Sequence, residues 1–318
     1  MNYKSLAFTS LSAVLLAGSV FAGNPTKIGT NSGAILRIPV GARGTALGGS
    51  GVANLTGVEA IFYNPAGLTG INKVQVTFSH MKYLADIDVN YGAVGFSMGE
   101  YGNVGLTFQG VNIGDILETS ESAASSFTGR TISPTTTVIG LNYSLDLTDQ
   151  VTVGTSANFY NEPLGDVDGS TVFLNFGVRY SNLWENLNVG VAFKNFGPDV
   201  EYTSSNKNEL WEQYELPSYF QIGVGYNFDL NEESSINVEA DFLNHSYSSD
   251  EVLFGAEYEF RKMLFLRAGY AYSAQDDYLY GMTLGAGLKY QSFGFDYAWR
   301  QTTDFFDHQQ LFTFNFSF

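Results

Sequence analysis

The chain has 318 residues and a formal charge of −17, which would repel nucleic acid, and no basic run offsets that charge locally. Only 15% of the residues are charged while 15% are aromatic, with 35 glycines and 20 tyrosines, which suits strands with one polar and one apolar face better than helical bundles. The sequence contains no cysteine, which excludes disulfides, thiol catalysis, thiolate metal sites and a lipid anchor on an N-terminal cysteine.

The first 22 residues are predicted to form a cleavable signal peptide. Lys4 gives the charged start, residues 6–17 form the apolar stretch, and Val20-Phe21-Ala22 resembles a small-residue cleavage site. We expect cleavage after Ala22 and location in the cell outer membrane. No later apolar run approaches the length of about 20 residues that a transmembrane helix needs, so an integral protein of this sequence would span as a barrel.

Residues 23–73 differ in character and are predicted to form an N-terminal plug, or hatch. Small residues cluster from Gly41 to Gly51 without sustained alternation, and Asn64 can cap a short helix that begins at Pro65. We expect residues 24–70 to fold into the barrel, with Arg43 held by at least one lumenal carboxylate, because an unpaired guanidinium away from water is costly. The alternative is a periplasmic tail that leaves Arg43 in water.

From Val74 to the end, segments of about ten residues alternate between apolar and small or polar residues, the length that a tilted barrel strand requires. About fourteen such segments begin near residues 74, 87, 103, 135, 151, 171, 187, 218, 235, 251, 263, 279, 292 and 310. The predicted fold is therefore all-β, a transmembrane antiparallel β-barrel over residues 74–318. In the segment after 171, we expect Val172, Leu174, Phe176 and Val178 to face lipid and Asn175 to face the lumen.

The connections between these segments alternate in length. Those after even strands are short, whereas 114–133 and 197–216, after odd strands, hold about twenty residues each. Short periplasmic turns and longer extracellular loops are typical of outer-membrane barrels. This pattern predicts that both ends of the barrel domain are periplasmic.

Charges of both signs recur at lumen-facing positions late in the chain. One interpretation is a polar path or a clamp on the plug; the other, which we favour, is that an interior shielded from lipid must pair its charges. The positions are Glu239, Asp241, Glu257, Glu259, Arg267, Lys289, Asp296 and Arg300.

Patterns that would indicate chemistry are weak in this sequence. Gly95-Phe96-Ser97-Met98-Gly99 fits the nucleophile-elbow pattern, but that mechanism needs a strand-to-helix turn, and Ser97 ends a predicted membrane strand. His80, His245 and His308 lie far apart without metal-ligand spacing. We therefore expect a protein that is not an enzyme, with no catalytic residues, no metal and no cofactor.

The last residues carry an alternating aromatic ladder. It resembles the terminal-strand signal that is read by the outer-membrane barrel assembly machinery, and the alternative is a buried edge strand of a soluble β-sandwich. The ladder consists of Phe312, Phe314, Phe316 and Phe318.

Two N-terminal motifs resemble the PorV/PorQ family of outer-membrane proteins, relatives of the FadL-type long-chain fatty-acid transporters. Gly114-Asp115-Ile116 and Asn195-Phe196-Gly197-Pro198 also resemble segments of that family. The first motif runs from Gly41 through Arg43 to Gly48 and Gly49, and the second is Tyr63-Asn64-Pro65-Ala66-Gly67-Leu68.

The resemblance implies a fourteen-stranded barrel with its N-terminal segment inside as a plug. It also implies a non-enzymatic role, either as an adaptor that binds secreted cargo or secretion-system proteins in a type IX-like pathway, or as a passive transporter of hydrophobic small molecules. We favour the adaptor. The expected partners are outer-membrane lipid, the barrel assembly machinery, and either cargo and secretion proteins or a hydrophobic ligand, but no nucleic acid.

Overall fold

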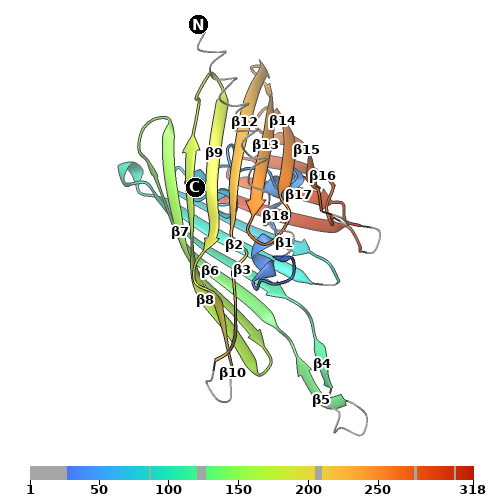
Figure 1. Cartoon of the computed structure of the whole chain (residues 1–318). Coiled ribbons are helices and arrows are strands. Elements are labelled where there is room, and N and C mark those ends of the chain that lie inside the picture. Colours follow the sequence, from blue (N-terminus) through green and yellow to red (C-terminus); the bar gives the residue numbers. More distant parts are fainter. Residues whose placement is uncertain (1–26, 86, 120–126, 205–209, 276–277, 304–305) are drawn as a thin grey trace.

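A computed structural model describes residues 27–85, 87–119, 127–204, 210–275, 278–303 and 306–318. The expected signal peptide, residues 1–22, lies outside these residues. Fourteen antiparallel strands form a closed barrel that surrounds an N-terminal segment of short helices (Figure 1). No helix in the described part of the chain is both long and apolar enough to cross a membrane.

The barrel wall consists of strands that follow one another around the barrel. They are β1 (Val74–Lys82), β2 (Asp88–Ser97), β3 (Asn103–Asn112), β6 (Thr135–Asp146), β7 (Val151–Leu164), β8 (Val167–Tyr180), β9 (Leu187–Phe196), β12 (Tyr219–Asn231), β13 (Ser234–His245), β14 (Glu251–Phe260), β15 (Leu264–Ser273), β16 (Met282–Tyr290), β17 (Phe293–Arg300) and β18 (Gln309–Ser317). Their starts lie within four residues of the predicted ones.

The first and last strands close the barrel. β18 pairs with β1 in register from Gln75 opposite Ser317 to Lys82 opposite Gln310. All other wall strands pair with their neighbours in the chain, and the β8–β9 ladder shifts register between Leu174 and Phe176. In a bilayer every backbone donor and acceptor needs such a partner, so closure is what makes this sheet compatible with lipid.

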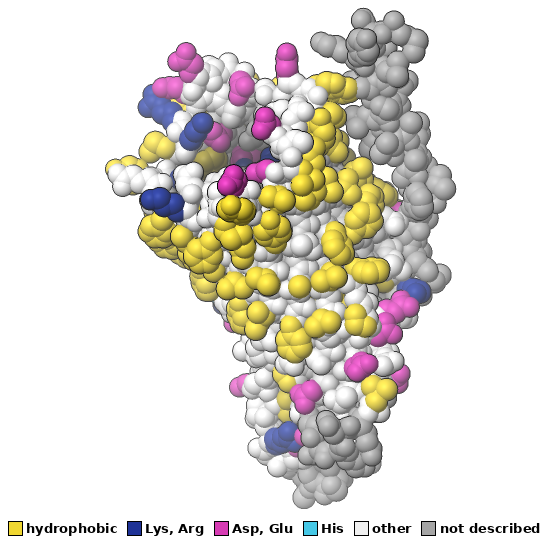
Figure 2. Space-filling view, turned by 90° about the vertical axis from the view of Figure 1, so that its left-hand side faces the viewer, with side chains coloured by type: hydrophobic (Ala, Val, Ile, Leu, Met, Phe, Trp, Pro, Cys, Tyr) yellow, Lys and Arg dark blue, Asp and Glu magenta, His cyan; other side chains and the backbone are white. Residues whose placement is uncertain are grey.

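Side chains alternate between lipid and lumen as the sequence predicts. Phe176 is 42% exposed on the outside of β8, whereas its neighbour Asn175 is 7% exposed and faces inward. Val172, Leu174 and Val178 share the outer face with Phe176. On the face shown in Figure 2, hydrophobic side chains form a band across the middle of the barrel, which is the surface that lipid would cover.

The two ends of the barrel differ. Short turns follow β2, β6, β8, β12, β14 and β16, and we call this end the short-turn rim. The opposite end, the long-loop rim, carries the connections of about twenty residues that the sequence predicts as loops. Outer-membrane barrels keep short turns in the periplasm, which predicts that the long-loop rim faces the cell exterior.

Both long connections contain strands that the sequence analysis did not predict. The first contains the hairpin β4 (Ile116–Thr119) and β5 (Phe127–Ile132), and the second contains β10 (Val200–Ser204) and β11 (Leu210–Tyr214). β10 also pairs with the outer end of β8. Strand pairing gives hydrogen-bond partners to backbone groups that would otherwise bind water. The paired strands project beyond the barrel (Figure 1).

Phe176→Arg tests the assignment of the lipid face. The substitution should lower the free energy of unfolding by about 2 to 4 kcal/mol if Phe176 lies near the bilayer midplane, because a guanidinium would enter hydrocarbon. Tyr290→Arg, at the short-turn end of β16, should cost about 0 to 1 kcal/mol because it lies near an interface. Urea titration of the protein in lipid vesicles gives both values, and equal penalties would reverse the assignment.

Candidate functional site

The plug occupies the lumen as a series of very short helices. They are η3 (Ala34–Arg37), α2 (Ala42–Ala46), α3 (Ala60–Tyr63) and η4 (Pro65–Gly67); a further one, η5 (Gly99–Tyr101), lies in the turn after β2. Ala42 and Ala46 of α2 are fully buried and share a cluster with Ala298 and Leu311 of the wall. The plug and the wall thus have a common core.

Glycines in the wall let the plug backbone lie directly against the strands. A Cβ atom at Gly154 of β7 would lie 2.3 Å from the backbone nitrogen of Ala66, and one at Gly190 of β9 would lie 2.1 Å from the carbonyl oxygen of Val52. No side-chain rotation relieves such contacts, because the atoms met are backbone. A Cβ atom would also meet plug backbone at Gly255 and Gly269, and plug side chains at Gly177 and Gly285.

Asn64 and Pro65 of the second motif form the predicted cap. The Asn64 side-chain oxygen accepts a hydrogen bond of 3.0 Å from the Ala66 nitrogen, and Pro65 is the first residue of η4. The Asn64 amide also donates to the carbonyl oxygens of Val52, at 2.8 Å, and Val178, at 3.2 Å. One side chain therefore ties two parts of the plug to β8.

Arg43 of the first motif forms a bidentate ion pair with Glu257 of β14. Its Nε and Nη2 donate to the two carboxylate oxygens at 3.1 and 2.9 Å, as the sequence analysis expected of a lumenal carboxylate. Arg267 donates to the same carboxylate at 2.6 Å and to Asp296 at 2.6 Å. The result is an alternating chain of four charges across β14, β15 and β17, with the plug at one end.

Two other lumenal carboxylates accept hydrogen bonds from the plug backbone. Asp241 accepts from the nitrogens of Gly51 and Val52 at 2.9 and 3.2 Å, and Glu239 accepts from that of Asn54 at 2.7 Å. These amides have no helix to pair with. The carboxylates of β13 therefore replace the secondary structure that this part of the plug lacks.

Glu59 fixes the start of α2 from within the plug. Its carboxylate accepts a hydrogen bond of 2.9 Å from the nitrogen of Gly44. Gly41 has φ 79° and lies so close that a Cβ there would be 2.2 Å from the Glu59 carboxyl group. Burial, and secondarily the Asp296 carboxylate, raise the pKa of Glu59 to about 7. The Gly41 position thus needs glycine both for its backbone conformation and for space.

The remaining motif glycines and lumenal charges occupy different places. Gly48 and Gly49 follow α2 with positive φ, and Gly67 ends η4. Glu259 and Lys289 line openings at the short-turn rim, and Arg300 lies at the long-loop end of β17. The structure therefore divides the predicted charge cluster into three groups. One group holds the plug, and we call it the plug clamp: Glu239, Asp241, Glu257, Arg267 and Asp296. The second group, Glu259 and Lys289, lies at the short-turn rim, and Arg300 stands apart from both.

The largest hollows of the lumen lie near its ends. Two openings at the short-turn rim, of about 820 and 410 Å³, are bordered by acidic and basic side chains (Figure 2). Between the plug and β3, β6, β7, β8 and β9 there is an interior cavity of about 40 Å³ with a mixed polar and apolar lining, enough space for a few waters. In the described residues the plug thus separates the two rims.

The aromatic ladder lies on the outer face of the closing strand β18. Phe314, Phe316 and Phe318 are exposed and Phe312 is half-buried, beside Phe293, Phe295 and Tyr297 of β17. Their recognition by the assembly machinery stays a prediction. The three histidines lie apart, with neighbours Asn90, Tyr247 and Thr302.

One cluster at the long-loop rim was missed by the sequence analysis. A pocket there is lined by tyrosines from several connections and strand ends. The sequence does contain a signal for this cluster. Connections that follow odd-numbered strands all lie at the long-loop rim, so tyrosines in or beside those connections could have been expected to lie near one another. They are Tyr83, Tyr219, Tyr247, Tyr278 and Tyr280.

Gly154→Ala tests the seating of the plug on the wall. The added methyl group meets backbone on the plug side, so the substitution should cost about 1 to 3 kcal/mol and speed protease cleavage within residues 27–73. Gly92→Ala, in β2, is the matched control because its Cβ would meet nothing within 4 Å. Equal stability and cleavage rates for both variants would contradict the close backbone contact.

Solved structures of similar fold include two toluene transporters and a FadL homologue. The Ralstonia pickettii toluene transporter TbuX has a TM-score of 0.58 at 14% identity over 87% of this chain and 98% of that one. The Pseudomonas putida toluene transporter TodX has a TM-score of 0.59 at 14% identity, over 86% and 96%. A Pseudomonas aeruginosa FadL homologue has a TM-score of 0.55 at 11% identity, over 87% and 98%. At such identities the likeness establishes a FadL-like fold.

No curated protein matches the chain. The family described as "Type IX secretion system membrane protein PorP/SprF" matches residues 59–318. This match agrees with the expected link to type IX secretion, through a different family of that system than the PorV/PorQ resemblance named. The chain belongs to the PorP/SprF family of type IX secretion system membrane proteins and has the FadL-like barrel fold.

Proposed function

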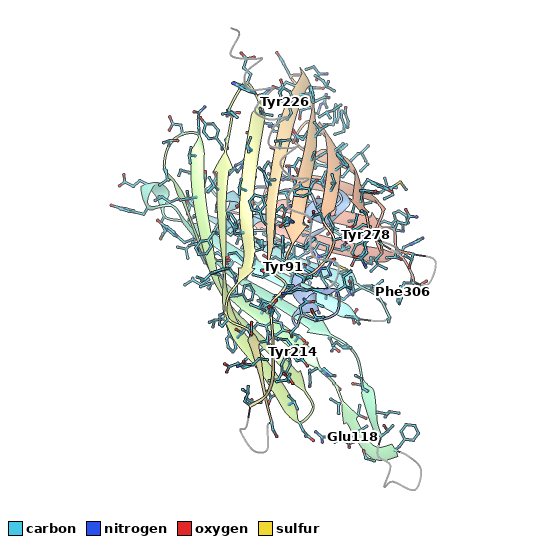
Figure 3. All side chains as sticks on the ribbon, in the orientation of Figure 1. Tyr91, Glu118, Tyr214, Tyr226, Tyr278 and Phe306 are labelled. Carbon is cyan, nitrogen blue, oxygen red and sulfur yellow. The ribbon has the colours of Figure 1, made fainter. Side chains whose placement is uncertain are left out.

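We propose that this protein is a non-enzymatic adaptor of type IX secretion that holds secreted cargo, or another secretion component, at its long-loop rim. The observation that carries the proposal is the set of strands that project from that rim. Glu118 and Tyr214 mark two of the projecting segments (Figure 3). Such a projection gives a partner an extended surface without disturbing the closed barrel below it.

The projecting segments form a connected platform. β7 and β8 have 14 residues each, more than the ten or so that a strand needs to cross a bilayer. The outer end of β8 pairs with β10. Arg130 of β5 reaches across to Glu118 at 3.4 Å and to Asp166, in the β7–β8 turn, at 3.1 Å. The β4–β5 hairpin and the β7–β8 hairpin are thus linked side by side.

The platform offers apolar contact area and a sheet edge. Leu117 is 60% exposed and Leu210 is 58% exposed, at positions outside the hydrophobic band. In the described part of the chain β11 pairs with β10 on one side only. An edge strand of this kind can accept an extended segment of a partner by backbone hydrogen bonding, while neighbouring apolar side chains supply contact area.

The filled lumen favours an adaptor over a channel for large solutes. The Arg43–Glu257 pair, the backbone contacts at the wall glycines and the small interior cavity leave no space for a polypeptide between the rims. A partner that arrives from another secretion component would therefore dock on the barrel instead of passing through it.

A paired substitution, Leu117→Asp with Leu210→Asp, tests the adaptor role. Because both side chains are exposed, the barrel should assemble normally, while the amount of type IX cargo retained at the cell surface should fall. Tyr101→Asp, exposed at the short-turn rim, is the matched control. Cell-surface labelling of cargo measures the effect, and normal retention in the double variant would refute docking on the platform.

A second candidate function, passage of small hydrophobic molecules, is supported by one feature of the wall. An apolar groove of about 850 Å³ on the lipid side of β6, β7 and β8 shares Asn158 and Phe173 with the interior cavity. Only these two side chains are common to both hollows, so they mark the place where a route through the wall would be shortest.

Toluene flux into proteoliposomes tests this second function. If the groove leads to a route, the full-length protein should raise uptake above that of protein-free liposomes. Ala157→Trp, which fills the outer groove, should abolish the increase. Uptake no faster than in protein-free liposomes would remove the transporter from consideration and leave the adaptor role untouched.

A further inference from the structure

The tyrosine-lined pocket at the long-loop rim has a volume of about 280 Å³ and lies between the start of the plug and seven strands or connections of the wall. Tyr278, in the connection between β15 and β16, lies at this side of the barrel (Figure 3). The pocket is separate from the plug clamp at Glu257 and from the projecting platform. Its size is near the lower end of the range typical of small-molecule sites.

Most of the charged groups in the pocket already have partners. The Oε1 atom of Glu251 lies 3.4 Å from Nη2 of Arg37 and 3.4 Å from Nε2 of His245. The Arg37 guanidinium also lies 4.9 Å from the centre of the Tyr247 ring. This group of side chains is therefore largely self-compensating and leaves no excess negative charge in the pocket.

Arg300 interacts electrostatically with Glu251, but in the described residues Glu251 forms its ion pairs with Arg37 and His245 instead. Arg300 is only 5% exposed, it lines the pocket, and its Nε and Nη1 have no hydrogen-bond partner among the described residues. Its guanidinium stacks at 3.4 Å over the Tyr280 ring, which stabilises the cation but accepts none of its hydrogen atoms in the plane. A buried guanidinium with vacant donors is costly unless an anion binds there.

A second buried group beside Arg300 also lacks partners. Gln309 of β18 is directly opposite Arg300 in the β17–β18 ladder, and neither polar atom of its side chain has a partner among the described residues. Unsatisfied buried polar groups are rare in native structures and call for an explanation. A polar ligand group in the pocket would supply partners to Arg300, which lines it, whereas Gln309 does not line it.

The other walls of the pocket suit a ring. Tyr83 and Tyr280 are joined by a 2.7 Å hydrogen bond between their hydroxyls, and the Tyr247 hydroxyl lies 3.0 Å from His245 Nδ1. Burial raises the pKa of Tyr83, Tyr247 and Tyr278 above its usual range, so these phenols stay neutral. Ile28, Leu243 and Leu279 add apolar area to the lining, and Asn31, Ser248 and Gln275 add polar groups. The tyrosines give an aromatic ring a surface for edge or face contact.

We propose that this pocket binds an aromatic monocarboxylate, with the carboxylate on Arg300 and the ring among the tyrosines. The carboxylate supplies acceptors for the vacant guanidinium donors, and the ring packs against Tyr278, because Arg300 already covers one face of Tyr280. Two sources have this chemistry: a free aromatic acid, or the C-terminus of a peptide whose last residue is aromatic. This ligand site goes beyond the adaptor role and does not depend on it.

Calorimetric titration of the full-length protein in detergent tests the site. Hippurate, which joins one aromatic ring to one carboxylate, should bind about ten- to hundredfold more tightly than its neutral amide, because the charged hydrogen bonds are lost in the amide. Equal affinity of the acid and the amide, or no binding of either, would overturn the proposal. A short peptide that ends in phenylalanine with a free carboxylate then distinguishes the sources: tighter binding than hippurate indicates a chain end, and weaker binding indicates a free acid.

Variants locate the binding in this pocket. Arg300→Gln should weaken hippurate binding about ten- to hundredfold. Tyr278→Ala removes part of the ring wall from a connection outside the barrel ladder, so it tests the pocket even if Arg300→Gln impairs folding. Arg261→Gln, on the opposite rim, is the control and should bind as the unaltered protein does. If Tyr278→Ala and every folded Arg300 variant bind hippurate normally, the assignment is wrong.

Discussion

Contact between the backbone of the plug and the backbone of the wall is the interaction on which the closed lumen depends. Helices of three to five residues cannot bury a continuous apolar face, so the plug gains stability only by lying flat against the strands. Glycine at positions such as 154 and 190 removes the side chains that would hold it away. The hydrogen bonds and the Arg43–Glu257 ion pair that join the plug to the wall need that short separation.

The acidic lumen has a related purpose. Because the plug helices are so short, most of their backbone amides have no intrahelical acceptor. Asp241, Glu239 and Glu59 provide acceptors at those places, and Arg43 and Arg267 keep the neighbouring Glu257 from being an isolated charge. The wall, together with Glu59 of the plug itself, therefore supplies acceptors that a longer helix would supply to itself.

Alternation along the chain was enough to predict the barrel, because the lipid and the lumen impose opposite demands on successive residues such as Asn175 and Phe176. The Asn64–Pro65 cap was also predictable, since it is local. The choice of Glu257 as the partner of Arg43 was not predictable, because it depends on the register between neighbouring strands and on where the plug lies along them. The β4–β5 hairpin escaped prediction for another reason: both of its faces are largely solvated, so no alternation is imposed.

The pairing of β1 with β18 has a consequence for how the chain reaches this state. The two strands are separated by almost the whole barrel sequence, so their ladder closes the longest loop in the molecule. Contacts so remote in sequence form slowly, and until they form both strands have unpaired edges that can join to another chain. Synthesis and export must therefore be complete before the barrel can close, and the unfinished sheet needs protection from its own copies throughout that interval.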